Sequence, residues 1–182
     1  CYERVAEKYT DTPLGSQSIA ILRRLNLKGQ PLELAGPTID GGFVKVAEFK
    51  GRPVLVVFWS TNAKPFTDML DDLLAATSRF PESQLAVIGV NLDVDESTVD
   101  TFLEQQDTRL KQQERPPINW RQIFHPDPAQ RGWKHPIATY YGVRQIPAVW
   151  LVGPDGQVAS TDVKPSSLVS QIAAFSRTAQ RD

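Results

Sequence analysis

The sequence predicts an α/β domain with a central mixed sheet flanked by helices, preceded by a β-hairpin and a short helical segment. The unbroken apolar run Val54–Trp59 suits a strand that is covered on both faces, as in a parallel sheet, and residues 85–92 predict a second buried strand. A helical pattern follows each run. A third run, Ala148–Val152, is joined by turn residues 153–156 to a shorter partner, which predicts an antiparallel hairpin. The order strand, helix, strand, helix therefore predicts a right-handed parallel crossover, to which the last two strands add an antiparallel pair.

The amino-terminal part is predicted to be helical. Residues 1–10 and 14–25 form two short helical patterns, separated by a capping residue and a proline suited to a first helical turn. Ile19, Leu22 and Leu25 would give the second helix one apolar side. The domain boundaries that follow are 1–27 for a helical appendage or the end of a preceding helical region, 28–178 for the main domain, and 179–182 for a tail.

A β-hairpin is expected next, because residues 32–34 and 43–46 alternate between apolar and polar around the turn residues Asp40, Gly41 and Gly42.

Two longer helices are predicted after the buried strands. The first begins near Pro65, and its apolar face is formed by Met69, Leu70, Leu73, Leu74, Thr77 and Phe80. The second is marked by Val99, Phe102 and Leu103, with Asp95 as its capping residue.

The rest of the chain alternates between exposed and core segments. Residues 104–117 are polar and predict an exposed helix extension followed by a loop. Trp120, Ile123 and Phe124 return to the core, and residues 125–128 form a turn. A short helix over residues 137–141 should stop at Gly142 in a left-handed cap, and a last helix should begin at Pro165.

Composition excludes several classes of function. The 20 Lys and Arg residues balance 21 Asp and Glu residues, so a nucleic-acid partner is not expected. A transmembrane segment would need about 18 consecutive apolar residues, and the sequence contains none. No signal-peptide pattern opens the sequence. Cys1 is the only cysteine, which excludes an internal disulfide, a redox pair of cysteines and a zinc site built on several thiolates. Cys1 either carries a lipid anchor, as in a bacterial lipoprotein, or simply happens to stand first.

Two segments carry a family resemblance. Residues 54–66 read VLVVFWSTNAKPF and resemble the active-site segment of TlpA-like, AhpC/TSA-related thiol–disulfide oxidoreductases, which runs roughly VLVNFWATWCGPC. Residues 142–156 resemble the second signature of that family, YGVRGIPTTFLIDRDG. The hairpin with Gly36, Pro37 and Thr38 looks like the family's amino-terminal extension. The resemblance covers roughly residues 28–176 and implies a thioredoxin-like fold.

The same resemblance shows where the family chemistry is missing. Ala63 stands at the position of the nucleophilic cysteine and Phe66 at that of the resolving cysteine. Family enzymes lower the pKa of the first thiol at a helix amino terminus so that a thiolate attacks a disulfide. Peroxiredoxin chemistry fails similarly, because no cysteine follows Thr61. The expectation is a degenerate site without catalytic residues or cofactor.

A groove remains as the candidate binding site. By position, Ile146-Pro147 is the family's cis peptide bond, and the groove beside it would be formed with Trp59, Asn62, Ala63 and Lys64. In the family, the residue before this proline pairs through its backbone with an extended peptide, which needs no thiol. Alternatively, the proline is only part of the fold. Phe66 is expected to fill the core. Lys64 opposes the helix dipole and either favours an anionic partner or is simply exposed.

Other chemistry-bearing residues have simple structural interpretations. His125 and His135, with Asp127 between them, could bind a metal, but solvated loop histidines are the favoured interpretation and no metal is expected. Asp93 and Asp95 follow the second strand, where ligand groups often lie in α/β sheets, and a capping role is favoured for them. Three tryptophans are assigned to core or partly buried positions, namely Trp120, Trp133 and Trp150.

The functional prediction is a redox-inactive, TlpA-like thioredoxin domain that binds a peptide or protein, or acts as a structural module. The alternative is a thiol–disulfide oxidoreductase or peroxidase whose cysteine lies outside this chain. A third interpretation is a scaffold that positions neighbouring domains. The family resemblance implies a periplasmic or otherwise extracytoplasmic bacterial location.

Overall fold

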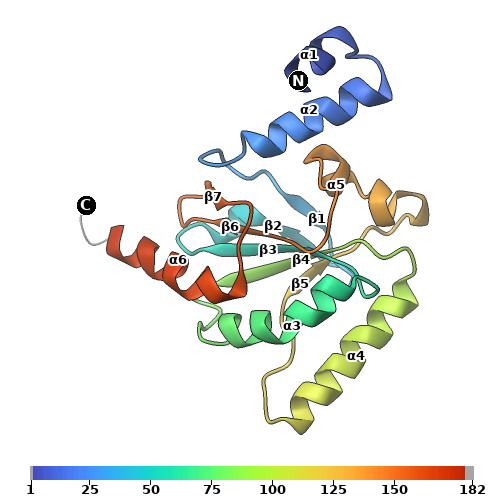
Figure 1. The fold of residues 1–182 in the computed structure, drawn as a ribbon. Coiled ribbons are helices and arrows are strands. Elements are labelled where there is room, and N and C mark those ends of the chain that lie inside the picture. Colours follow the sequence, from blue (N-terminus) through green and yellow to red (C-terminus); the bar gives the residue numbers. More distant parts are fainter. Residues whose placement is uncertain (1, 179–182) are drawn as a thin grey trace.

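The computed structural model describes residues 2–178, so Cys1, its candidate lipid anchor and the expected tail at 179–182 lie outside the described residues. A five-stranded sheet in the order β5-β4-β3-β6-β7 forms the centre, and a two-stranded hairpin lies beside it (Figure 1). The strands are β1 (Ala35–Pro37), β2 (Phe43–Lys45), β3 (Val54–Trp59), β4 (Ala86–Asn91), β5 (Arg121–Ile123), β6 (Ala148–Val152) and β7 (Val158–Ser160). The helices are α1 (Tyr2–Lys8), α2 (Pro13–Leu25), α3 (Lys64–Thr77), α4 (Glu96–Gln112), α5 (Pro136–Tyr140) and α6 (Pro165–Thr178).

Strand β3 is the centre of the sheet, and all six of its residues are buried. It pairs in parallel with β4, Val54 opposite Ala86, and antiparallel with β6, Val54 opposite Val152. Strands that are buried on both faces need apolar side chains at every position, which is why the unbroken run predicted this strand correctly.

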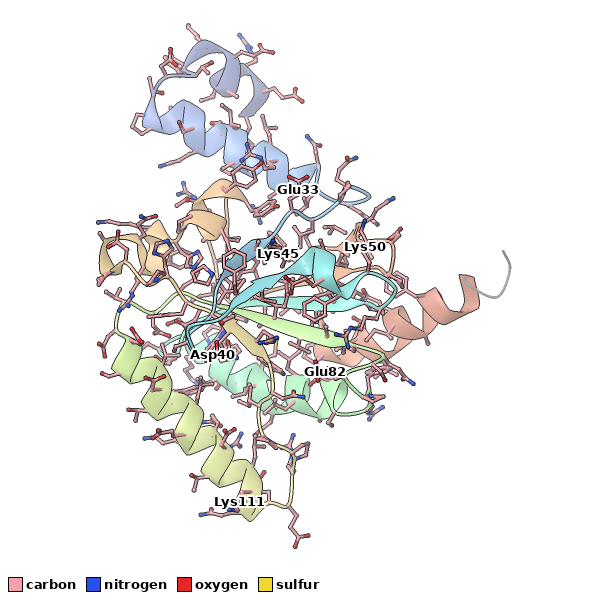
Figure 2. The ribbon with its side chains drawn as sticks, turned by 180° about the vertical axis from the view of Figure 1, so that it is seen from behind. Glu33, Asp40, Lys45, Lys50, Glu82 and Lys111 are labelled. Atoms are coloured by element: carbon pink, nitrogen blue, oxygen red, sulfur yellow. The ribbon has the colours of Figure 1, made fainter. Side chains whose placement is uncertain are left out.

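Two cores lie on opposite faces of the sheet. One contains alternate residues of β3 from Val54 to Phe58 and is covered by the β1–β2 hairpin and by α5. The other contains Leu55, Val57 and Trp59 and is covered by α3, α4 and α6. Figure 2 shows the hairpin side, with Asp40 in the turn that joins β1 to β2. The carboxyl ends of β3 and β4 therefore emerge between the layer of the hairpin and α5 and the layer of α3, α4 and α6.

Both outer strands of the sheet are covered by other parts of the chain. The backbone of β7 exchanges hydrogen bonds with the segment before the hairpin, since Gly29 N donates to Val158 O and Val158 N donates to Gln30 O. At the other edge, Phe124 N donates to Pro37 O, next to the end of β5. The sheet thus has little free backbone along its sides.

The hairpin and β5 differ from the expectation. The first hairpin strand is β1 at Ala35–Pro37, whereas residues 32–34 are irregular. Leu32 and Leu34 are buried without being in a strand, so their alternation reports burial alone. Strand β5 went unpredicted because three residues are too few to establish a period.

The amino-terminal helices pack through small residues. The buried positions of α2 are Gly15, Ser18 and Ala20, whereas Leu25 is 61% exposed, so the apolar side expected there is wrong at this residue. A Cβ atom on Gly15 would lie 1.8 Å from the carbonyl oxygen of Tyr9, which explains the close approach of α1 and α2. Helix α2 lies against α5 (Figure 1).

Gly142 ends α5 as predicted, with a φ of +61°. A Cβ atom here would lie 2.8 Å from the backbone of Ala20. Gly142 is therefore required both for its left-handed conformation and for the contact between its turn and α2.

Candidate functional site

The loop of residues 60–63 joins β3 to α3 and carries the position of the absent nucleophile. Ala63 is the N-cap residue of α3 and has no side chain that could accept a hydrogen bond there. It is partly buried and packs against the core. Free N–H groups at a helix amino terminus favour a negative charge, so the electrostatic frame for a thiolate is present without the thiol.

Phe66 fills the core at the position of the resolving cysteine, as predicted. It is 1% exposed, and its ring centroid lies 4.9 Å from that of Trp59. Phe102 of α4 packs on both rings, 5.6 Å from Trp59 and 6.5 Å from Phe66. This aromatic cluster excludes water from the space in which a second thiol would act.

Trp59 lies in the core and presents no surface to a groove. It is 1% exposed, and its Nε1 donates a hydrogen bond of 3.0 Å to Oε1 of Gln122. The two side chains meet above Gly89, where a Cβ atom would lie 2.0 Å from Oε1 of Gln122. The expected groove wall at Trp59 is thus replaced by a buried support beneath the loop, because α4 covers the ring from outside.

Asp93 is the structural anchor of the loop, a role that the sequence did not reveal. Its carboxylate accepts hydrogen bonds from the Ser60 hydroxyl (2.8 Å), from the Thr61 amide and hydroxyl (both 2.9 Å) and from the Asn91 side chain (2.8 Å). It is 6% exposed, so the negative charge is held by directed donors instead of water. Its place just after a buried strand was the only signal available. The other carboxylate, Asp95, caps α4 as predicted by accepting from the amide of Thr98.

The other residues that were predicted to form the groove do not line one common hollow. Asn62 is exposed and lines a hollow of about 540 Å³ together with Asp93, Val94 and Trp133. Ile146 and Pro147 are not among the lining residues of this hollow. Lys64 is exposed and forms an ion pair of 2.7 Å with Asp68, a contact worth about 0.3–0.5 kcal/mol at most. Its charge is therefore partly compensated on its own helix.

The Ile146-Pro147 peptide bond is cis, and both residues are partly exposed. Phe58 pairs with Ala148, so Pro147 directly precedes the β3–β6 ladder. In the described chain, the backbone N–H groups of Arg144, Gln145 and Ile146 donate to no other backbone group. The turn before Pro147 thus carries open backbone donors near the carboxyl end of β3.

The interpretation of both histidines as solvated loop residues is wrong for His135, which is 2% exposed. Nδ1 of His135 accepts a hydrogen bond of 3.2 Å from the amide of Ile137 and so caps α5. Burial, together with the nearby His125, lowers the pKa of His135 to about 4. The two rings meet edge to face with centroids 5.9 Å apart. Among residues 2–178, no group of three or more metal-ligating side chains comes together.

The exposure of Trp133 contradicts the sequence prediction, which placed this residue in the core or at a partly buried position. It is 52% exposed, whereas Trp120 and Trp150 are buried as predicted. The short 3-10 helix Gly132–Lys134 turns the indole outward, because Gly132 has a φ of +63° and is itself buried.

No helix in the described part of the chain is long and apolar enough to cross a membrane.

Comparison with known proteins agrees with this geometry. Thiol-disulfide oxidoreductase ResA from Bacillus thuringiensis subsp. konkukian is 23% identical over 137 residues, covering 75% of this chain and 69% of the relative. The thioredoxin domain of a thiol-disulfide oxidoreductase from Bacteroides vulgatus superposes with a TM-score of 0.65 at 20% identity, covering 81% of this chain and 96% of that one. A structure from Chlorobium tepidum that carries the name thiol:disulfide interchange protein DsbE gives a TM-score of 0.63 at 24% identity, covering 81% and 96%.

The fold and the site define a TlpA-like domain of thioredoxin fold whose redox positions carry no thiol. Residues 29–161, well over half of the sequence, match the model of the AhpC/TSA family. The chain belongs to the AhpC/TSA family.

Proposed function

We propose that this chain is a redox-inactive member of the thiol–disulfide oxidoreductase group that binds an extended peptide or protein segment beside Pro147. The observation that carries the proposal is the pair Ala63 and Phe66 within an otherwise intact frame. Alanine offers no nucleophile to the helix amino terminus, and a buried phenylalanine cannot resolve a mixed disulfide.

Peptide binding is supported by the open backbone of residues 144–146. A bound strand needs main-chain donors and acceptors that are not already paired, and the two sides of the sheet are covered. The turn before Pro147 has such donors and lies near the carboxyl end of β3, the strand that leads into the loop of residues 60–63. Binding there uses no thiol, so the loss of both cysteines leaves this part of the family's machinery usable.

The absence of redox activity is tested by insulin reduction with dithiothreitol as the electron source. The protein should give a turbidity rate equal to that of buffer with dithiothreitol alone. The Cys1→Ser variant should behave identically, because Cys1 lies outside the family-like domain. Turnover by both proteins would contradict the proposal and would support the alternative of an oxidoreductase.

The proposed peptide binding is tested by a charge placed at Ala63. Ala63→Glu should abolish retention of partner proteins in a pull-down, whereas Ser78→Glu, at the exposed opposite end of α3, should not. Equal retention by the two variants would favour a scaffold that engages neighbours elsewhere.

We also propose an extracytoplasmic bacterial location, which is supported by the resemblance to TlpA-like proteins. Fractionation of cells expressing the full gene should place the protein outside the cytoplasm. If Cys1 is acylated, the protein should enter a detergent phase and lose this property in Cys1→Ser. Recovery in the cytosol alone would contradict the proposed location.

A further inference from the structure

A second hollow lies on the other side of Trp133, between α2, α5 and the turn at residues 142–144. Its volume is about 560 Å³, and we call it the α2–α5 hollow. Trp133 lines both this hollow and the one that contains Asn62. The exposed indole is therefore the ridge between the degenerate site and the amino-terminal helices.

The lining of the α2–α5 hollow combines apolar side chains with one cation and the neutral polar residues Ser16, Gln17 and Thr139. Its apolar walls are Ala20, Ile21, Ala138, Val143 and Trp133. Among residues 2–178, Arg144 is the only charged residue that lines the hollow, and no carboxylate does so. In the described chain Arg144 forms no ion pair; its Nη2 instead donates a hydrogen bond of 2.9 Å to Oε1 of Gln17 on α2. Gln17 thus orients the guanidinium without neutralising it.

The backbone of the turn that carries Trp133 is hydrogen-bonded to Asp93, the residue that also holds the loop of residues 60–63. Gly132 N donates to the carbonyl oxygen of Asp93 (3.3 Å), whose carboxylate holds Ser60 and Thr61. His135 N donates to Gly132 O (3.0 Å), which closes the turn around Trp133. Val94 packs against this turn and is itself 65% exposed. The backbone that carries Trp133 is thus fixed, and an aromatic side chain with two rotatable bonds loses little conformational freedom when it is covered, which favours binding.

We propose that the α2–α5 hollow receives part of the same extended peptide partner, with a bulky apolar side chain beside Trp133 and a neighbouring carboxylate on Arg144. This inference rests on the proposed function, because the peptide paired with residues 144–146 would run directly past the hollow. It adds the chemistry of the partner: an apolar residue adjacent to Asp or Glu. The amino-terminal helix α2 becomes part of the binding site.

The positive charge of Arg144 favours a peptide with an acidic residue over a purely apolar or a basic peptide. An arginine without a carboxylate partner at the edge of an apolar hollow pairs well with an incoming carboxylate, in two parallel hydrogen bonds. Lys134, exposed on the same turn as Trp133 and in no ion pair within the described chain, adds a second cation at the ridge. A basic segment would instead bring like charges together.

The test is selection of short random peptides displayed on phage against the Cys1→Ser protein. Selected peptides should be enriched in a large apolar residue next to Asp or Glu. Trp133→Ala and Arg144→Glu should each weaken their binding by about tenfold or more, as expected for an anchor residue. The matched controls are Phe43→Ala, because Phe43 is 53% exposed on β2, and Arg79→Glu, because Arg79 is exposed in the turn that follows α3; neither should change the affinity. Peptides with Lys in place of the acidic residue should recover binding to Arg144→Glu, which also shows that this variant is folded.

The outcomes separate this inference from the proposed function. Some peptides could bind Trp133→Ala and Arg144→Glu normally but fail to bind Ala63→Glu. This result would overturn the proposal that the α2–α5 hollow binds the peptide and would leave the proposed binding beside Pro147 standing. Peptides whose binding is weakened by Trp133→Ala and Arg144→Glu but not by Ala63→Glu would support binding in the α2–α5 hollow and overturn the proposed binding beside Pro147. No enrichment over an unrelated protein overturns both. A dimer in solution that Trp133→Ala dissociates would assign the surface to a second copy of the chain and overturn the peptide proposal.

Discussion

At the residue scale, Ala63 occupies a position whose electrostatics still suit an anion. It caps α3 without a side-chain hydrogen bond, and Lys64 adds a positive charge at the next residue. In the Cys1→Ser background, Ala63→Cys should therefore carry a thiol with a pKa below the ordinary value of about 8.5. Ser78→Cys, at the carboxyl end of the same helix, should titrate above Ala63→Cys.

The pH dependence of the rate of alkylation by iodoacetamide measures both pKa values. Identical profiles for the two cysteines would contradict the expectation. A single cysteine is sufficient for this experiment. Phe66 is better left in place, because emptying its core position would cost about 3 kcal/mol.

Gly89 has no side chain, and this leaves room for the contact between Trp59 and Gln122. The contact between Trp59 and Gln122 occupies the space that a Cβ atom would need. Gly89→Ala should lower the free energy of unfolding by about 2 kcal/mol, as is typical of an overpacked core. The measurement is urea denaturation followed by tryptophan fluorescence.

A double-mutant cycle supplies the control for Gly89. In the Gln122→Ala background the cost of Gly89→Ala should be smaller, because the side chain that the new methyl group meets most closely is gone. Equal costs in the two backgrounds would show that the packing of Gly89 against Gln122 is not the cause.

At the scale of elements, α5 depends on a neutral histidine. His135 is 2% exposed and accepts a hydrogen bond from the amide of Ile137 through Nδ1, which requires that nitrogen to be unprotonated. Its pKa is lowered from 6.5 to about 4 in the folded protein, first by burial and then by His125. The unfolded chain therefore binds a proton at a higher pH than the folded chain does.

The stability of the protein should consequently fall as the pH decreases from about 6.5 to about 4. In this window the unfolded state binds more protons, so the free energy of unfolding rises with pH and the contribution of His135 is complete above about 6.5. The depression of the pKa corresponds to about 3 kcal/mol. Urea denaturation at several pH values measures the slope.

His135→Asn should flatten this dependence, because asparagine caps a helix without titrating in this range. His125→Gln should keep most of the slope, since burial is the larger cause of the shift. An unchanged slope in His135→Asn would assign the pH dependence to other groups.

At the scale of the whole molecule, the sequence predicted the sheet more fully than the site. The run Val54–Trp59 is apolar at every position because β3 is covered on both faces, and local sequence reports this directly. Trp59 belongs to the same run, yet its covering by Phe102 comes from a helix more than forty residues further along. No local pattern carries that information, so Trp59 was placed in the groove and Asp93 was seen only as a possible cap or ligand.

Trp133 illustrates the opposite error. Tryptophan near a turn and a short helix suggests a partly buried position, but its exposure is decided by the positive φ of Gly132 and by the backbone contact with Asp93. Both depend on how distant segments meet. The missing thiols, in contrast, were predictable because a family motif fixes their positions in the sequence itself.

The covered edges of the sheet have a consequence for self-assembly. Fibres grow when one molecule's open strand becomes the template for the next, and here both outer strands are already occupied by the chain itself. The unpaired donors lie instead in the short turn before Pro147, and proline has no N–H with which to continue a ladder. Pairing that begins in this turn would therefore end after a few bonds, so the segment proposed to bind there would not become the template for a further strand.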